Sequence, residues 1–223
     1  VAKGKDVDYS KGIAITSGIY PDKNTHIETC RYGKGQGAMS LLATLLVDKH
    51  DYVPRPILWL WNIIRHPLVF LRSMNPIGVS EKSTYVLVMQ TISNYMRFDY
   101  KRRWWRLGKR SMNSDCDTDQ KVPAYIPVAN EYTKRLAEKI DGDPAASITE
   151  IFLNTSTTAH IMGGCVMSDS PVNGVIDHKG QIFGYKNLYV ADGSIVPANL
   201  GVNPSLTITA MAEYILDQVP EKI

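Results

Sequence analysis

The first part of the chain carries short hydrophobic patterns that change from a strand type to a helix type. Residues 12–32 contain two strand-like runs on either side of a Pro-Asp-Lys-Asn turn, and they predict two short strands. Residues 38–47 are helical by composition and follow a glycine-rich loop. The apolar tract 57–72 predicts one or two helical pieces broken at Pro67, because proline interrupts the hydrogen bonds of a helix.

The middle of the chain carries a continuous apolar run, then an alternating one. The run at 83–93 is typical of a strand that is buried on both faces. Residues 95–107 alternate between apolar and polar positions at first, and they predict the partner strand of a hairpin with that run. The polar stretch 108–122 has turn composition and predicts a surface loop.

The next segment gives the clearest helix pattern. Apolar residues recur every fourth position from Val128 to Ile140, which predicts an amphipathic helix ended by the Asp-Gly pair at 141–142. From residue 150 onward the chain becomes rich in glycine and poor in charge, with no internal repeat. Strands and helices together predict a mixed fold.

Near the carboxyl end, a strand signal precedes a strong helix start. The sequence "LYVAD" at 188–192 predicts a buried strand that ends in Asp192-Gly193. Asn203-Pro204 then opens the last helix, since asparagine is a favoured cap and proline is favoured in the first turn. The free amides and the positive dipole end of a helix N-terminus attract anionic groups. This order of elements indicates an anionic cofactor.

Composition narrows the classes of function. The 223 residues carry 25 Lys and Arg against 22 Asp and Glu, and this near balance argues against a dedicated nucleic-acid binder. The three cysteines are far apart in the sequence, so we expect no disulfide framework and a reducing compartment. The chain starts at Val1 without a basic-then-apolar leader, and we expect it to be part of something longer.

The segment "AHIMGGCVMS" at 159–168 places His160 before two glycines and a cysteine. From the residues alone, this histidine is an acid/base catalyst, a metal ligand or a core histidine beside a turn. Metal ligation together with Cys165 and His178 lacks any standard ligand spacing, so no metal site is predicted.

Three motifs in this order carry a resemblance to a known family: "HIMGGC", "GYKNLYVADGS" and "GVNPSLTITAMAE". They resemble the C-terminal part of a glucose–methanol–choline (GMC) oxidoreductase, and more closely its cholesterol-oxidase-like branch. The match is dense over about 157–216 and weaker over 10–50, and the segment between them matches only in general character.

The resemblance implies an FAD enzyme that oxidises an alcohol. Its His–Asn pair, which faces the flavin and the substrate hydroxyl, falls on His160 and Asn203. A histidine can accept the hydroxyl proton near neutral pH, while an asparagine orients substrate without titrating. The resemblance also places the ribityl and pyrophosphate near Asp192 and Gly193, and the pyrimidine side of the flavin at the helix start.

Two of these assignments have simpler alternatives. Asn203 is in the position of a helix cap, which would turn its side chain onto its own helix rather than onto a substrate. Asp192 is equally suited to a turn or cap. The implied cofactor-binding residues follow from the motifs: Asp192, Gly193, Asn203, Pro204 and Ser205.

The resemblance further implies a glutamate that moves a proton on the steroid after oxidation and thereby isomerises its double bond. In "NTHIETCRYGKG", Glu28 falls about where that glutamate is expected. A carboxylate buried in an apolar pocket suits proton shuttling, because burial disfavours its charged form. The alternative is an exposed carboxylate paired with Arg31.

The family's fold implies an α/β chain with α+β character in two parts. Residues 1–156 are expected to be a portion of the substrate domain, an antiparallel sheet with helices. Residues 157–223 are expected to add a strand and the last helix to the FAD-binding domain. The strand–GxGxxG–helix (Rossmann) unit that binds the FAD pyrophosphate does not occur in the sequence, and "GKGQG" at 33–37 lacks its spacing. We therefore expect weak FAD binding and little activity from this chain alone.

Trp59, Trp61, Trp104 and Trp105 lie in apolar or basic surroundings. Aromatic and basic residues together are typical of a membrane interface, and they also suit single-stranded nucleic acid. Buried tryptophans beside a solvated basic face are the simpler alternative. We expect possible membrane-surface contact through these four residues, no nucleic acid, and a cytoplasmic or peripheral membrane location.

The sequence thus predicts part of an FAD-dependent oxidoreductase acting on a sterol or another bulky alcohol, with oxygen or another electron acceptor. The first alternative is a GMC dehydrogenase for a different bulky alcohol. The second is a non-catalytic remnant that lacks the cofactor.

Overall fold

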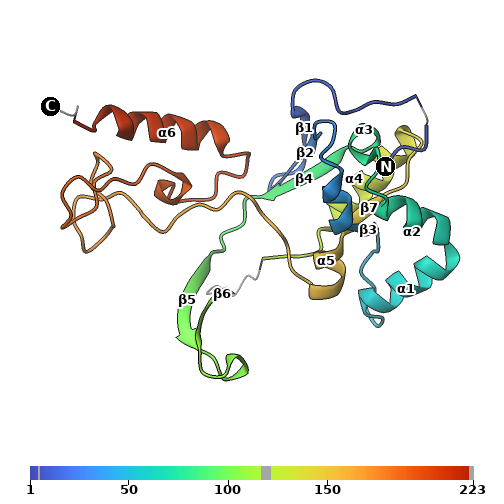
Figure 1. Ribbon diagram of the computed structural model, residues 1–223, viewed down its shortest axis with the longest axis horizontal. Helices are drawn as coiled ribbons and strands as arrows, with labels where there is room; N and C mark the ends of the chain where they lie inside the picture. Colours follow the sequence, from blue (N-terminus) through green and yellow to red (C-terminus); the bar gives the residue numbers. More distant parts are fainter. Residues whose placement is uncertain (5, 117–121, 221–223) are drawn as a thin grey trace. The chain divides into compact units, whose positions relative to one another are not determined.

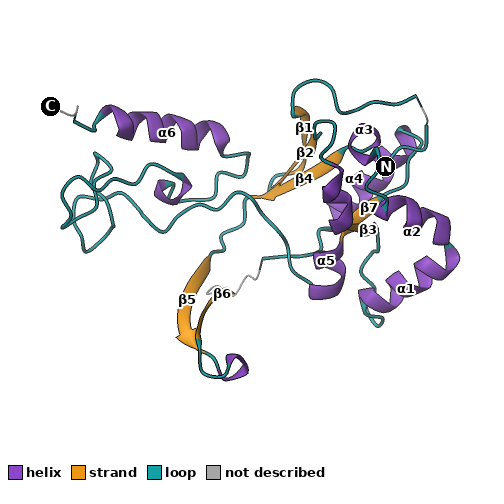
Figure 2. Ribbon diagram, in the orientation of Figure 1, coloured by secondary structure: helices purple, strands orange, loops and turns teal. Residues whose placement is uncertain are grey.

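The computed structural model divides the chain into two compact units, which we describe separately (Figure 1). It describes residues 1–4, 6–116 and 122–220. The first unit comprises Val1–Val88 and Ser93–Thr157, and the second comprises Met89–Ile92 and the chain from Thr158 onward. Helices and antiparallel strands both occur, as the mixed fold class predicts (Figure 2).

A three-stranded sheet of order β1-β2-β4 contains β1 (Ile15–Asp22), β2 (Thr25–Cys30) and β4 (Tyr85–Gln90). β1 and β2 form an antiparallel hairpin with Gly18 opposite Glu28, which confirms the predicted strand pair. β2 is the central strand and is buried from its first residue through Glu28. Side chains on both faces of this strand are therefore shielded from water.

The predicted pairing of residues 95–107 with 83–93 is wrong. β5 (Met96–Arg102) pairs with β6 (Arg110–Cys116), while β4 lies beside β2. β6 falls in the stretch 108–122 predicted as a loop, of which 117–121 lie outside the described residues. The chain reverses at Leu107 and Gly108, which both have positive φ. A hydrophobic pattern shows which face of a strand is apolar, but it does not identify the neighbouring strand.

The three longer helices of the first unit agree with the sequence pattern. α1 (Arg55–Arg65) and α2 (Pro67–Met74) are two pieces separated at His66, as the proline predicts. α4 (Pro127–Lys139) is the amphipathic helix, and Asp141 after it has positive φ. Among the described residues, no helix is long and apolar enough to cross a membrane. Two shorter helices are α3 (Val79–Lys82) and α5 (Ile148–Leu153).

The helix predicted at 38–47 is wrong from residue 43 onward. Gly37–Leu42 forms a short 3-10 helix, and β3 (Ala43–Leu45) then pairs with β7 (Ala145–Ser147). The side chain of Thr44 is buried and accepts a hydrogen bond from the indole of Trp59. Strand pairing and this buried contact therefore override the helical composition of the segment.

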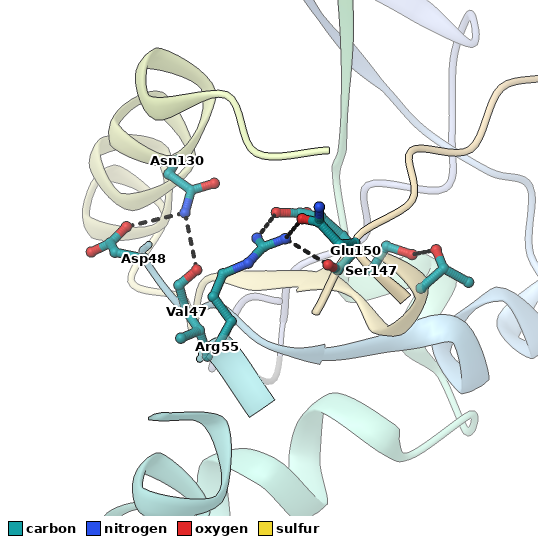
Figure 3. Close-up of polar contacts among 8 residues, drawn as sticks. Val47, Asp48, Arg55, Asn130, Ser147 and Glu150 are labelled. Carbon is teal, nitrogen blue, oxygen red and sulfur yellow. Dashed lines mark hydrogen bonds and ion pairs between the residues drawn. The ribbon is translucent and has the colours of Figure 1, made fainter. Parts of the chain in front are cut away.

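A buried arginine connects α1 to α5 (Figure 3). Arg55 is 8% exposed, and its guanidinium donates to the carboxylate and to the backbone carbonyl of Glu150, both at 2.5 Å. It also donates to the Asn154 side chain at 3.4 Å and lies 5.4 Å from the Tyr125 ring centre. Because a carboxylate, a carbonyl, an amide oxygen and an aromatic ring all contact this cation, its burial is compensated.

A second polar contact attaches α4 to the segment after β3 (Figure 3). The side-chain amide of Asn130 donates to Asp48 at 3.0 Å and to the Val47 carbonyl at 3.5 Å. Burial raises the pKa of Asp48, but the hydrogen bonds from Lys134 and Asn130 outweigh it and lower that pKa overall. The amphipathic helix is thus fixed by polar as well as apolar contacts.

The second unit packs around a small apolar cluster formed by Ile176, Ile195, Val196 and Ile215. Ile215 belongs to α6 (Ser205–Asp217), which confirms the predicted last helix. The strand predicted at 188–192 is wrong, because Tyr189 makes only an isolated bridge to Gln181. Gly180, whose carbonyl accepts from the Val190 amide, has positive φ, and Asp192 already caps the 3-10 helix Gly193–Ile195, so the bridge does not continue into a longer ladder.

The buried ion pair yields a stability prediction. Replacing Arg55→Leu leaves the Glu150 carboxylate without its cation, so we expect the free energy of unfolding to fall by about 3–5 kcal/mol. The control is Arg135→Leu, which removes an exposed pair with Glu131 and is expected to cost under about 0.5 kcal/mol. Denaturant unfolding measures both, and similar losses in the two variants would contradict a special role for Arg55.

Candidate functional site

The segment that contains His160 is held by backbone hydrogen bonds to the turn after Asp192. The Gly163 amide donates to the Gly193 carbonyl at 3.2 Å, and the Cys165 amide donates to the Ser194 carbonyl at 2.9 Å. Two motifs that are far apart in the sequence therefore lie side by side in the second unit. The His160 amide donates to the Thr158 hydroxyl at 3.0 Å, and the histidine is half-buried.

Gly193 allows three segments to meet at this point. A Cβ on Gly193 would lie 2.8 Å from the Ile161 carbonyl oxygen and 3.1 Å from the end of the Ile208 side chain on α6. Real Cβ atoms essentially never come that close to a backbone oxygen. Only glycine, with no side chain, allows the His160 segment and α6 to approach the same turn.

Asp192 caps the short 3-10 helix Gly193–Ile195. Its Oδ1 accepts from the Ser194 hydroxyl at 2.5 Å and from the Ser194 amide at 2.8 Å. These two hydrogen bonds, the hydroxyl first, lower the pKa of Asp192 below its usual value. The turn role considered from the sequence is therefore present. Because both bonds fall on Oδ1, Oδ2 remains as an acceptor for a ligand.

Asn203 lies two residues before the first residue of α6, and its side chain is bonded to that residue. Its Oδ1 accepts from the Ser205 hydroxyl at 2.8 Å and from the Ser205 amide at 3.3 Å. Pro204 is buried at the helix start, and the first helical residue is Ser205. The oxygen of the amide is used by the helix, so the group that can act on a substrate is the Nδ2 donor.

The loop that leads to Asn203 is fixed by a residue that the sequence analysis did not single out. Asn199 donates through Nδ2 to the Gln90 carbonyl at 2.6 Å and accepts from the Gly201 amide at 2.9 Å. A Cβ on Gly201 would overlap the Thr91 hydroxyl. The signal was an asparagine two residues before a glycine, which is the spacing of a side-chain-capped turn.

Glu28 lies on β2 in the first unit and is buried at 9% exposure. Its Oε1 is 3.7 Å from the Nδ1 of His26. The alternative pairing with Arg31 is wrong, because that guanidinium donates to the Lys11 carbonyl and to the Thr16 hydroxyl. The carboxylate is therefore an internal group, as a proton-shuttling role requires.

The four tryptophans divide into one half-buried and three exposed residues. The Trp59 indole donates to the Thr44 hydroxyl at 2.6 Å, and its ring lies edge-on to Phe152 at 4.7 Å between centres. Trp59 is half-buried and packs partly inward, and the membrane-surface contact expected of the four tryptophans stays a prediction. The other three are exposed: Trp61, Trp104 and Trp105. Within the described ranges, no three His, Cys, Asp or Glu side chains could share a metal ion.

Comparison with known proteins identifies the family. The family profile "GMC oxidoreductase" matches residues 84–212, more than half of the chain, and the chain belongs to this family. A cholesterol oxidase of Acinetobacter baumannii is 47% identical over 98% of this chain and 39% of its own length. One of Mycobacterium tuberculosis (strain ATCC 25618 / H37Rv) is 42% identical over 97% and 38%. A long-chain-alcohol oxidase of Arabidopsis thaliana is 41% identical over 30% of this chain and 9% of that protein.

These relatives are longer proteins. The chain spans about 39% of the length of the Acinetobacter baumannii protein. The dense part of the resemblance, about 157–216, falls largely within the profile match. The residues of this chain therefore establish the family, and they correspond to only part of the longer relatives.

The close approach at Gly193 yields a prediction. In Gly193→Ala, the new methyl group must displace the Ile161 carbonyl, so we expect a loss of about 1–3 kcal/mol in stability. The Gly163 and Cys165 amides should also exchange with solvent faster. Gly33→Ala is the control, because a Cβ there meets no atom within 4 Å. Unchanged amide exchange in Gly193→Ala would contradict the packing described.

The cap at Asp192 yields a prediction about pH. Because folding lowers its pKa, Asp192 contributes stability above its usual pKa, and this contribution is lost as the pH falls through the lowered value. Ser194→Ala removes the main cause, so the pKa of Asp192 should rise toward its usual value. Carboxyl carbon NMR measures the titration. Ser205→Ala, which removes a hydroxyl bonded to Asn203 instead, should leave it unchanged.

Proposed function

We propose that this chain is the substrate-binding and flavin-covering part of an FAD-dependent alcohol oxidoreductase. In this proposal, residues 1–156 belong to the substrate domain and residues 157–223 to the FAD-binding domain. The enzyme oxidises a sterol-type secondary hydroxyl to a ketone. The supporting observation is that the His160 segment, the Asp192-Gly193 turn and the start of α6 meet at one glycine.

The residues of the second unit fit a flavin at this place. The first-turn amides of α6, a 13-residue helix, have no partner within the helix and present a positive dipole end. Asp192 Oδ2 offers an acceptor, and Gly193 brings the backbone close without a side chain. When bound, FAD supplies the acceptor for the hydride that leaves the carbinol carbon.

His160 and Asn203 have different proposed roles at the substrate hydroxyl. His160 takes the hydroxyl proton as the carbonyl forms, which suits imidazole near neutral pH. Asn203 donates from Nδ2 to the substrate oxygen and keeps the alcohol aligned, while its Oδ1 stays on Ser205. The N-terminus of α6 stabilises the negative charge that develops on reduction.

Glu28 supports a second step, the movement of the double bond. Its carboxylate removes a proton from the carbon between the new ketone and the double bond, and the electron pair spreads as a dienolate. The proton then returns to the far carbon of the former double bond, which leaves a conjugated enone. No electrons are gained or lost overall, so a single buried carboxylate is sufficient.

The relatives support a choice of electron acceptor, and the exposed end of the β5–β6 hairpin supports a source for the substrate. The relatives named above are oxidases, which favours oxygen over another acceptor as the partner of the reduced flavin. Trp104, Trp105 and Leu107 are exposed at the end of the β5–β6 hairpin, among arginines and lysines. Such a tip suits contact with a membrane surface from which a sterol is taken.

Bound flavin is the direct test. We expect little flavin absorbance from the chain alone, and a yellow, alcohol-reducible protein when an amino-terminal GMC segment with the pyrophosphate-binding unit is supplied. His160→Ala and Asn203→Leu should each slow flavin reduction by about 10²–10⁴-fold. His178→Ala, which changes an exposed histidine beside Asp169, is the control and should reduce at the normal rate.

Three outcomes decide between the alternatives. No flavin under either condition contradicts an enzyme and favours a non-catalytic remnant. Normal rates in both His160→Ala and Asn203→Leu contradict the assigned roles. Flavin reduction by a sterol without hydrogen peroxide favours a dehydrogenase that uses another acceptor.

A further inference from the structure

His26 and Glu28 form a buried polar pair on β2, and the proposed mechanism uses only Glu28. They are two residues apart on one strand, so their side chains point to the same face. His26 is 8% exposed and Glu28 is 9% exposed. Within the described part of the chain, His26 Nδ1 and Glu28 Oε2 are buried side-chain atoms without a hydrogen-bond partner.

The neighbouring strand β1 holds the imidazole in place. The Tyr20 ring stacks on His26 with 4.3 Å between ring centres and an angle of 7° between planes. Gly18 lies opposite Glu28 in the hairpin, and a Cβ there would be 2.5 Å from His26 Nε2 and 3.5 Å from Glu28 Cγ. Tyr20 and Gly18 on β1 thus leave a space that fits the His26 ring.

The other titratable groups near this pair do not compete for the carboxylate. Burial raises the pKa of the Cys30 thiol, two residues further along β2. Burial also raises the pKa of Tyr85 on β4, so both groups stay neutral near pH 7. Arg31 is bonded elsewhere. Of these groups, His26 is the donor that faces the carboxylate.

We infer that His26 is a positioning residue for Glu28, which holds Oε1 and leaves Oε2 as the oxygen that exchanges a proton with the substrate. The present Nδ1–Oε1 distance of 3.7 Å closes to a hydrogen bond with a shift of about 0.5–1 Å. A carboxylate fixed through Oε1 keeps Oε2 directed first at the carbon that loses the proton and then at the carbon that receives it. This inference rests on the proposed isomerisation by Glu28 and deepens it.

The activity test separates oxidation from isomerisation in the flavin-loaded protein. Flavin reduction by a sterol reports oxidation, and a β,γ-unsaturated keto-steroid supplied directly reports isomerisation through the absorbance of its conjugated product. His26→Phe keeps a ring against Tyr20 but removes Nδ1. We expect it to lower the kcat of isomerisation about tenfold or more, while KM and oxidation change less than about twofold.

Two further variants make the comparison specific. His26→Asn returns an N–H donor near the position of Nδ1 and should recover most of the isomerisation rate. Thr29→Val is the matched control on the opposite face of β2, where the hydroxyl lies 2.9 Å from that of Ser17. It should isomerise normally. A normal rate in His26→Phe, or equal losses in Phe and Asn variants, would overturn the positioning role.

A structural readout keeps this inference distinct from the proposed function. Ring nitrogen chemical shifts of His26, measured in this chain at about pH 8, report which nitrogen carries the proton. A carboxylate facing Nδ1 favours the Nδ1–H form, so Glu28→Leu should shift the ring toward Nε2–H. An unchanged tautomer overturns the His26–Glu28 pairing. If the pairing is seen but the wild-type protein oxidises sterol without isomerising it, the role proposed for Glu28 fails instead.

Discussion

The close packing of backbone at Gly193 is the constraint on which the proposed site depends. A carbonyl from the His160 segment and a side chain from α6 both lie where a Cβ would be. The same turn carries Asp192, whose carboxylate is used to cap it. The approach of the His160 segment and the approach of α6 therefore both depend on one residue without a side chain, at the turn where the proposed anionic-group site lies. Any larger residue would separate these parts.

Two of the buried charged side chains of the first unit, Arg55 and Glu28, differ in how their charge is compensated. Arg55 has hydrogen bonds to a carboxylate, a backbone carbonyl and an amide, so its charge is compensated and serves stability. Glu28 is buried to a similar degree, but one of its oxygens has no partner among the described residues. An unsatisfied buried group is costly, and a protein keeps such a group where its chemistry is used.

Much of the fold could be predicted from the sequence where the signals are local. The turn between β1 and β2, the break at Pro67 and the spacing of α4 depend on neighbouring residues. The errors arise where a distant partner decides: 38–47 is drawn into strand pairing by β7, and β5 turns back onto β6. The motifs indicated His160, Asp192 and Asn203, which stay predictions as catalytic or cofactor residues. His26 was missed because its importance comes from Tyr20 and Gly18 on another strand.

Asn203 shows that a cap and a catalytic donor are compatible roles for one amide. The sequence posed them as alternatives, since a capping side chain turns toward its own helix. In the structure the capping contacts fall on Oδ1, and Nδ2 is a separate donor on the same rigid plane. Fixing Oδ1 on Ser205 removes rotation about the last side-chain bond and so fixes the direction in which Nδ2 points. In the proposed site, these contacts pre-organise the donor, so that the entropy of orienting it is lost on folding rather than on substrate binding.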